Sequence, residues 1–246
     1  MVRIFYGPVD SWRFGRSLGV DPLAGREKRC PFSCIYCQYG ETRRFVRGRQ
    51  VFVTRQQLQA EMAALGTVAA DCVTFAGLGE PTLAANLPEL VQVVRRRFSC
   101  PVIILTGSGL ICRADVRADL LAFDAVVAKL DAPDEALFRQ INRPLRGAPC
   151  AWTAIVEGLR HFRRVYEGRL VLQMMFVQAN KDAALRIAEL ARSLHPDEVQ
   201  LNTPLQPALG GPVSEAEMRE IADHMADLPV SCVYRDGQAQ VTPRFL

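Results

Sequence analysis

Short, nearly uninterrupted apolar runs alternate along the chain with longer segments in which apolar residues recur every three or four positions. A short continuous apolar run is typical of a strand buried on both faces, and the longer spacing is typical of a helix with one buried side. The pattern predicts strands at residues 17–21, 72–76, 102–106, 125–130, 170–177 and 198–202.

Helices are expected between these strands, and several of them carry recognisable start signals. Thr54 is placed to cap one helix, Pro88 stands in the first turn of another after Asn86, and Ser214 with Glu217 forms a capping box. The predicted helices span residues 55–65, 87–98, 115–122, 134–141, 153–166, 181–194 and 214–226.

The order of these elements, strand then helix repeated along the chain, predicts an α/β fold with parallel strands and outer helices. Such units either close partly into a barrel or spread into an open sheet. In both cases functional residues gather at the carboxyl ends of the strands. The Pro- and Gly-rich stretch 203–212 is interpreted as a loop. We therefore expect one domain over residues 1–246, with a C-terminal extension over residues 204–246.

Composition narrows the class of protein. The chain has 246 residues, of which 49% are hydrophobic and 23% charged, with a formal net charge of +4. This balance excludes a disordered or collagen-like chain. The mild positive charge permits an anionic partner without identifying one. No signal peptide is visible, and no apolar stretch approaches the roughly 18 residues of a membrane span. We therefore expect a cytoplasmic protein with no membrane partner.

Eight cysteines are the unusual feature, and three of them fall close together. Cys30, Cys34 and Cys37 have the spacing C-x3-C-x2-C, which lets three thiolates converge from one loop over residues 22–45. A four-iron cluster takes one protein ligand per iron, usually a cysteine thiolate. Three local cysteines leave one iron open to a chelating small molecule. The other five are scattered and are expected to be small core residues.

A structural zinc site is the alternative. Structural zinc usually takes four Cys or His ligands, commonly in two pairs. The sequence offers no second closely spaced pair, and His161, His195 and His224 stand alone. Ligand counting favours iron and sulfur, and a zinc module or an electron-transfer protein is kept as the non-enzymatic alternative.

The cysteine triad, with Tyr36 just before its last member, resembles the signature of the radical S-adenosylmethionine (SAM) superfamily. The resemblance implies a partial (β/α)6 barrel in which the cysteines hold one 4Fe–4S cluster and SAM chelates the fourth iron. It also implies reductive cleavage of SAM to a 5′-deoxyadenosyl radical that abstracts hydrogen from a substrate. A reducing partner such as flavodoxin or ferredoxin is then required.

A second motif follows the second predicted strand. Gly77-Leu78-Gly79-Glu80 resembles the glycine–glutamate motif of the same superfamily. The resemblance implies that Gly77, Gly79 and Glu80 receive the amino group of SAM through backbone and carboxylate. A strand-to-helix turn ahead of Pro81 is the structural alternative.

Polar residues end the later predicted strands, at the edge where an α/β barrel binds ligands. Ser108, Lys129, Asp131 and Asn180 are the candidates for the ribose and carboxylate of SAM. Lys129 offers a point charge to the carboxylate, and Asp131 offers an acceptor to the ribose. Asn202 is the candidate on the adenine side. Helix caps and turns are the structural alternative for each.

The segment 7–20 and the stretches 79–83 and 141–144 resemble a branch of the superfamily related to wyosine-base synthases. That resemblance implies modification of a transfer-RNA guanosine as one alternative function. Activation of a glycyl-radical enzyme is another alternative.

Arginines near the triad favour an anionic substrate or partner, including RNA. Arg13 and Arg16, beside the first predicted strand, are the candidates for contact with the substrate. A second group follows the cysteines and is placed to steer an anionic substrate or an acidic electron donor. This group consists of Arg43, Arg44, Arg47 and Arg49.

Overall fold

Strands that follow one another along the chain also lie side by side in a single sheet. The computed structural model describes residues 3–43, 46, 48–148, 151–205 and 210–234. Within these residues the strands are β1 (Phe5–Ser11), β2 (Gly15–Val20), β3 (Cys72–Phe75), β4 (Val102–Thr106), β5 (Ala125–Lys129), β6 (Arg169–Met175), β7 (Glu198–Asn202) and β8 (Val230–Cys232). β1 pairs antiparallel with β2, and each later pair of neighbours is parallel.

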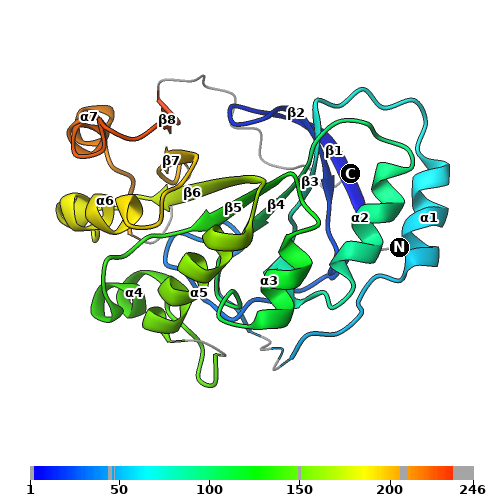
Figure 1. Ribbon diagram of the computed structural model, residues 1–246, viewed down its shortest axis with the longest axis horizontal. Coiled ribbons are helices and arrows are strands. Elements are labelled where there is room, and N and C mark those ends of the chain that lie inside the picture. Colours follow the sequence, from blue (N-terminus) through cyan, green and yellow to red (C-terminus); the bar gives the residue numbers. More distant parts are fainter. Residues whose placement is uncertain (1–2, 44–45, 47, 149–150, 206–209, 235–246) are drawn as a thin grey trace.

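The sheet curves into a half-barrel, and the helices lie around its outer side from α1 at one end to α7 at the other (Figure 1). This arrangement confirms the predicted α/β fold with parallel strands and outer helices. The helices are α1 (Arg55–Ala64), α2 (Leu87–Arg95), α3 (Ala114–Leu120), α4 (Glu135–Asn142), α5 (Trp152–Val165), α6 (Ala184–Arg192) and α7 (Glu215–Asp223). In the described part of the chain, no helix is long and apolar enough to cross a membrane.

The capping signals were correctly interpreted. Thr54 and Ser214 each accept a hydrogen bond from the amide three residues later, and both capping boxes are complete. The predicted helix at 181–194 is instead divided into a short 3-10 turn, η2 (Lys181–Ala183), and α6. A second 3-10 turn, η1 (Pro81–Leu83), follows the glycine–glutamate motif.

The two edge strands were not predicted. β1 contains Gly7 and Pro8, and its register shifts between Tyr6 and Val9. Proline is tolerated there because an edge strand has no neighbour on its outer side, but it weakens the apolar signal. β8 has only three residues, too few for a periodic pattern. Both strands depend on pairing with a neighbour that the local sequence does not reveal.

The two faces of the sheet bury different residues. The face toward the helices forms the main core. The concave face carries a smaller apolar cluster, on which Phe14 packs from the turn between β1 and β2. This concave cluster consists of Cys72, Ile103, Ala125, Val127 and Val171.

A row of polar residues crosses the concave face nearer the carboxyl ends. Lys129, Gln173, Gln200 and Ser231 are Cα partners across β5, β6, β7 and β8. Partner residues of neighbouring parallel strands point to the same face, because successive side chains alternate between faces. The concave face therefore carries an apolar cluster on β3 to β6 and a polar row that crosses β5 to β8.

Candidate cofactor and substrate site

The three cysteines lie on the long segment between β2 and α1, at the carboxyl-end rim of the sheet. Arg29, just before Cys30, forms an isolated bridge with Gly79. The Glu80 amide donates to the Arg29 carbonyl at 2.8 Å, and the Arg29 amide donates to the Leu78 carbonyl at 3.2 Å. The start of the loop is thus held beside the glycine–glutamate segment that follows β3.

The rest of the loop is held by the end of α4. The Ser33 amide donates to the Asn142 carbonyl at 3.1 Å, and the Ile35 amide donates to the Ile141 carbonyl at 2.9 Å. A further bond from the Cys37 amide to the Cys34 carbonyl, at 3.1 Å, turns the chain between the last two cysteines. Two segments distant in sequence therefore hold the loop. Residues 44–45 of the predicted loop lie outside the described residues.

All three cysteines of the loop are half-buried free thiols. Burial, with a smaller contribution from the Asp131 charge, raises the pKa of Cys34 to about 11. Burial also raises the pKa of Cys30 well above its ordinary value. Metal binding must therefore displace the thiol protons at neutral pH. In the described ranges, no three His, Cys, Asp or Glu side chains are grouped to hold a single metal ion.

Both glycines of the glycine–glutamate segment allow a close approach of the backbone. Gly79 has φ of +148°, and a Cβ there would lie 2.0 Å from the Arg29 carbonyl oxygen. A Cβ on Gly77 would lie 2.2 Å from the carboxyl carbon of Asp21. Residues with a side chain are excluded at both positions. Gly79 therefore allows the backbone of the motif to lie directly against the cysteine loop.

Glu80 connects the carboxyl ends of β3 and β4. Its side chain is buried, and its Oε1 accepts hydrogen bonds from the Thr82 amide and hydroxyl and from the Thr106 hydroxyl. Its Oε2 accepts from the Gly107 amide at 2.7 Å. Burial raises the pKa of Glu80, and these donors oppose the rise. The carboxylate is thus engaged within the protein.

Lys129 and Asp131 meet the cysteine loop at the end of β5. The Lys129 Nζ lies 3.3 Å from Asp131 Oδ1 and 4.7 Å from the centroid of the Tyr36 ring. The Tyr36 hydroxyl donates to Asp131 Oδ2. The Asp131 side chain is fully buried, whereas the Lys129 side chain is 17% exposed. Of the two, Lys129 is the group that a ligand can reach.

The other predicted polar residues tie strand ends together. The Asn180 amide group donates to the Asp131 carbonyl at 2.9 Å. The Ser108 hydroxyl donates to the Lys129 carbonyl at 3.0 Å, and Ser108 itself has φ of +65°. The Asn202 side-chain oxygen accepts from the amide of the next residue at 2.9 Å. All of them are buried at the rim where the sequence placed them.

Asn142 was not among the candidates, although it touches the site most directly. Its Nδ2 lies 3.6 Å from Cys34 Sγ, 3.3 Å from the Tyr36 hydroxyl and 2.9 Å from Asp131 Oδ2. It is the last residue of α4, and Arg143 after it has φ of +46°. The sequence signal that could have identified Asn142 is its place in the stretch 141–144, which resembles the superfamily branch.

The two arginines predicted to contact the substrate have different environments. The Arg16 side chain is 54% exposed and its Nε lies 3.9 Å from Asp71. Arg13 is half-buried, and its Nε is a fully buried atom with no hydrogen-bond partner among the described residues. Of these two arginines, only Arg13 has a buried N–H group that donates to no described residue.

The second arginine group is only partly described, because Arg44 and Arg47 lie outside the described residues. Arg43 is exposed. The Arg49 side chain is 6% exposed and forms ion pairs with Asp115 and Asp119. Arg49 therefore ties the cysteine-bearing segment to α3.

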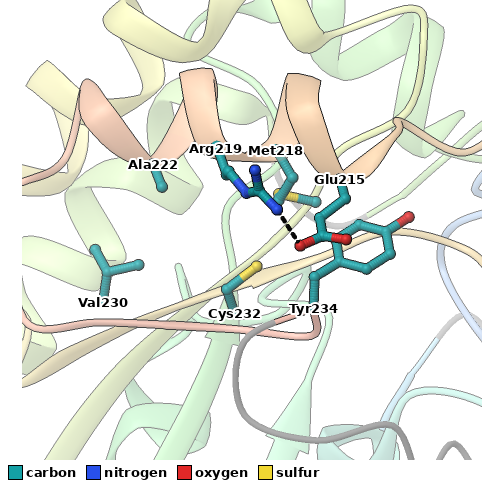
Figure 2. Close-up of a pocket in the computed structure, with 7 residues that line it drawn as sticks. All are labelled: Glu215, Met218, Arg219, Ala222, Val230, Cys232 and Tyr234. Carbon is teal, nitrogen blue, oxygen red and sulfur yellow. Dashed lines mark hydrogen bonds and ion pairs between the residues drawn. The ribbon is translucent and has the colours of Figure 1, made fainter.

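A shallow pocket of about 170 Å³ lies between α7 and β8. Figure 2 shows Glu215 and Arg219 of α7 paired above it, with Cys232 and Tyr234 on the side of β8. Cys232 belongs to the main core that packs against the helices. The pocket is therefore on the outer side of the sheet, away from the cysteine loop.

The scattered cysteines differ among themselves. Cys72 and Cys232 are buried, as expected of core residues, and Cys100 is half-buried. Cys112 is disulfide-bonded, which the sequence did not indicate. Cys150 lies outside the described residues.

A half-barrel with parallel strands, a three-thiol loop at its carboxyl-end rim and a glycine segment pressed against that loop defines a class of cofactor-binding α/β proteins. The donor set fits an iron–sulfur cluster, since thiolates are the ligands that such clusters take. The chain belongs to the Radical SAM superfamily, whose family model matches residues 28–207. The family implies a 4Fe–4S cluster and SAM, and the resemblance inferred from the cysteine motif is confirmed.

A relative from Synechocystis, the UPF0026 protein slr1464, is 38% identical over 205 residues. The match covers 82% of this chain and 76% of the relative.

Solved structures of the same class share the fold. The structure of TYW1 with a lysine–pyruvate adduct bound has a TM-score of 0.64 at 17% identity, covering 87% of this chain and 74% of that chain. The structure of native anSMEcpe with bound AdoMet has a TM-score of 0.65 at 16% identity, covering 90% of this chain and 64% of that chain. These matches confirm the partial barrel.

Proposed function

We propose that this chain is a radical SAM enzyme that holds one 4Fe–4S cluster on Cys30, Cys34 and Cys37. Such a cluster would supply one-electron reduction of SAM, giving methionine and a 5′-deoxyadenosyl radical that takes a hydrogen atom from the substrate. The single observation that carries the proposal is the docking of the three-thiol loop between the glycine–glutamate segment and Asn142.

The amino and carboxylate groups of SAM have separate partners in this proposal. The backbone of Gly77 and Gly79 receives the amino group, and the buried Glu80 behind them supplies negative charge. Lys129 receives the carboxylate, because it is the partly exposed cation of the rim. The Asp131 partner keeps Lys129 in place through an ion pair of 3.3 Å.

The remaining predicted residues contribute mainly by holding the rim of the sheet in shape. Ser108 and Asn180 donate to carbonyls at the end of β5 and just after it, so they set the shape of the rim on which the ribose rests. Asn202 lies at the end of β7 and borders the adenine side. Each is buried, so its removal disturbs the rim before it removes a contact with SAM.

The concave face is the proposed substrate chamber. Its apolar floor excludes water, which protects reactive intermediates. Its polar row offers hydrogen bonds nearer the cofactor. Gln200 is fully buried there, and its Nε2 donates to Glu198 at 3.1 Å, while its Oε1 has no partner in the part of the chain that the structure describes. Because the Glu198 carboxylate can only accept a hydrogen bond, the Gln200 atom that faces it is the amide nitrogen. The Gln200 Oε1 is then the acceptor for an N–H or O–H group of the substrate.

A small acidic protein such as flavodoxin or ferredoxin is the proposed electron donor. The net charge of +4 supports such a partner, because complementary charge speeds association.

The test is anaerobic reconstitution with iron and sulfide, followed by addition of SAM and dithionite. We expect about four irons per chain and formation of 5′-deoxyadenosine. Cys34→Ala is expected to abolish 5′-deoxyadenosine, because it removes one of only three ligands. Cys100→Ala is the matched control, since Cys100 is a half-buried free thiol outside the loop.

Two outcomes would overturn the proposal. One is continued 5′-deoxyadenosine formation by Cys34→Ala at the wild-type rate. The other is metal analysis of anaerobically purified protein that finds one zinc and no iron, which would restore the zinc module.

A further inference from the structure

Arg13 lies in the turn between β1 and β2, at the amino-end edge of the sheet. β2 runs parallel to β3, so its first residue, Gly15, marks that edge. Phe14, next to Arg13, packs against the apolar cluster of the concave face. The turn therefore packs against the concave face at the amino ends of the strands.

Tyr6, on β1, lies on the same concave face. A Cβ on Gly19 would lie 2.1 Å from the Tyr6 ring, so the ring covers Gly19. Gly19 is the Cα partner of Thr74, whose hydroxyl contacts Cys72 of the concave cluster. Tyr6 therefore lies on the concave face, and its hydroxyl donates to the Ala76 carbonyl just after β3. Arg13 interacts electrostatically with Tyr6.

No acceptor is provided for this guanidinium by the part of the chain that the structure describes. Arg13 forms no ion pair there, and its Nε is the one cationic nitrogen among the fully buried atoms without a partner. The centroid of the Trp12 ring lies 5.4 Å from the Arg13 Cζ. A ring face orients a guanidinium without occupying its N–H donors.

Burial makes the charge on Arg13 unfavourable, and the described residues supply no counter-charge for it. Burial lowers the pKa of Arg13 to about 10, so the group stays charged at neutral pH in a site that disfavours the charge. A buried unpaired charge is costly, and an oxyanion with two acceptor oxygens matches the planar donors of arginine. The Arg13 side chain is only half-buried, so part of it stays exposed to solvent.

We propose that Arg13 binds an oxyanion group, a carboxylate or a phosphate, of the substrate that enters the concave side of the half-barrel. This inference rests on the proposed function, because it takes the concave face as the substrate chamber. It assigns the negative charge of the substrate to the end of the chamber away from the cysteine loop.

Arg16 provides the matched control. It lies three residues from Arg13 in the same hairpin, but it is exposed and faces Asp71. Arg13→Gln and Arg16→Gln each remove one positive charge from the same hairpin. A difference between them therefore reports a specific site and cannot come from net charge.

The experiment is anaerobic calorimetric titration of cluster-loaded protein with pyrophosphate and, separately, with succinate. The buffer contains no phosphate, SAM or reductant. We expect one site for at least one of the two anions in the wild type, and the better-bound anion identifies the phosphate or carboxylate source. Arg13→Gln should weaken binding by about tenfold or more, the range for hydrogen bonds to charged groups. Arg16→Gln should change it by less than about twofold.

Arg13→Lys keeps the positive charge but loses the planar pair of N–H donors. Its affinity for the anion should therefore lie between those of the wild type and Arg13→Gln. Each variant is first checked by its thermal midpoint. Failure of the wild type to bind either anion, equal binding by Arg13→Gln, or equal weakening by Arg16→Gln would overturn the inference. Because the titration requires no SAM cleavage, its failure is distinct from failure of 5′-deoxyadenosine formation.

Discussion

At the residue scale, Glu80 shows how a predicted ligand can also be a structural connection. Its four hydrogen bonds come from Thr82, Thr106 and Gly107 and join the ends of β3 and β4. A carboxylate is suited to this position because every neighbour is a donor.

Glu80→Gln should therefore lower the free energy of unfolding by about 2–3 kcal/mol, because the new amide nitrogen faces a donor and leaves it unsatisfied. Urea unfolding of the anaerobic apoprotein measures the change. Glu89→Gln, at an exposed glutamate in the first turn of α2, is the control and should change stability by less than about 0.5 kcal/mol. A Glu80→Gln protein as stable as the wild type that no longer binds SAM would instead assign the carboxylate to SAM directly.

At the element scale, α4 carries Asn142 to the cysteine loop, so the start of this helix bears on the site. Asp134 is its N-cap, and its Oδ1 accepts from the Leu137 amide at 2.9 Å. Its Oδ2 lies 2.7 Å from Arg186 of α6. The Leu137 amide, and then Arg186, hold the pKa of Asp134 below its ordinary value.

Asp134→Ala should lower stability by about 1 kcal/mol at neutral pH, the usual cost of losing an N-cap. Because the pKa is lower in the folded state, this contribution is present above the unfolded value of about 3.9 and is lost as pH falls through the folded value. The difference between wild type and variant should therefore be larger at pH 7 than at pH 3. Unfolding at both pH values measures it, with Asp182→Ala in the exposed turn η2 as control. An equal difference at both pH values would contradict the assignment.

At the scale of the whole molecule, Asn142 joins three segments that are far apart in the sequence. Its amide contacts Cys34 on the loop, Asp131 after β5 and its own helix end. An N–H donor near a ligating sulfur stabilises the added electron of a reduced cluster.

We therefore expect Asn142→Ala to make the reduction potential of the reconstituted cluster more negative by tens of millivolts, since a net hydrogen bond contributes about 1 kcal/mol. Slower 5′-deoxyadenosine formation with dithionite should accompany the change. Redox titration followed by electron paramagnetic resonance is the measurement. Asn86→Ala is the control, because Asn86 lies before α2 and bonds to the Val53 carbonyl. A reduction potential in Asn142→Ala equal to that of the wild type would contradict this role of Asn142 in setting the potential.

The sequence by itself determined the elements whose signals are local. Apolar runs located β2 to β7, and the caps at Thr54 and Ser214 located two helices, because these signals lie within a few neighbouring residues. The spacing of Cys30, Cys34 and Cys37 identified the superfamily for the same reason.

Only the tertiary structure decided which residues meet. It placed Asn142 against Cys34, engaged Glu80 with donors from two strand ends, and distinguished the half-buried Arg13 from the exposed Arg16. It also added the edge strands β1 and β8, which form through pairing with a neighbour. Contacts between distant segments and the burial of a charge depend on the packing of the whole sheet, and neither leaves a local signal in the sequence.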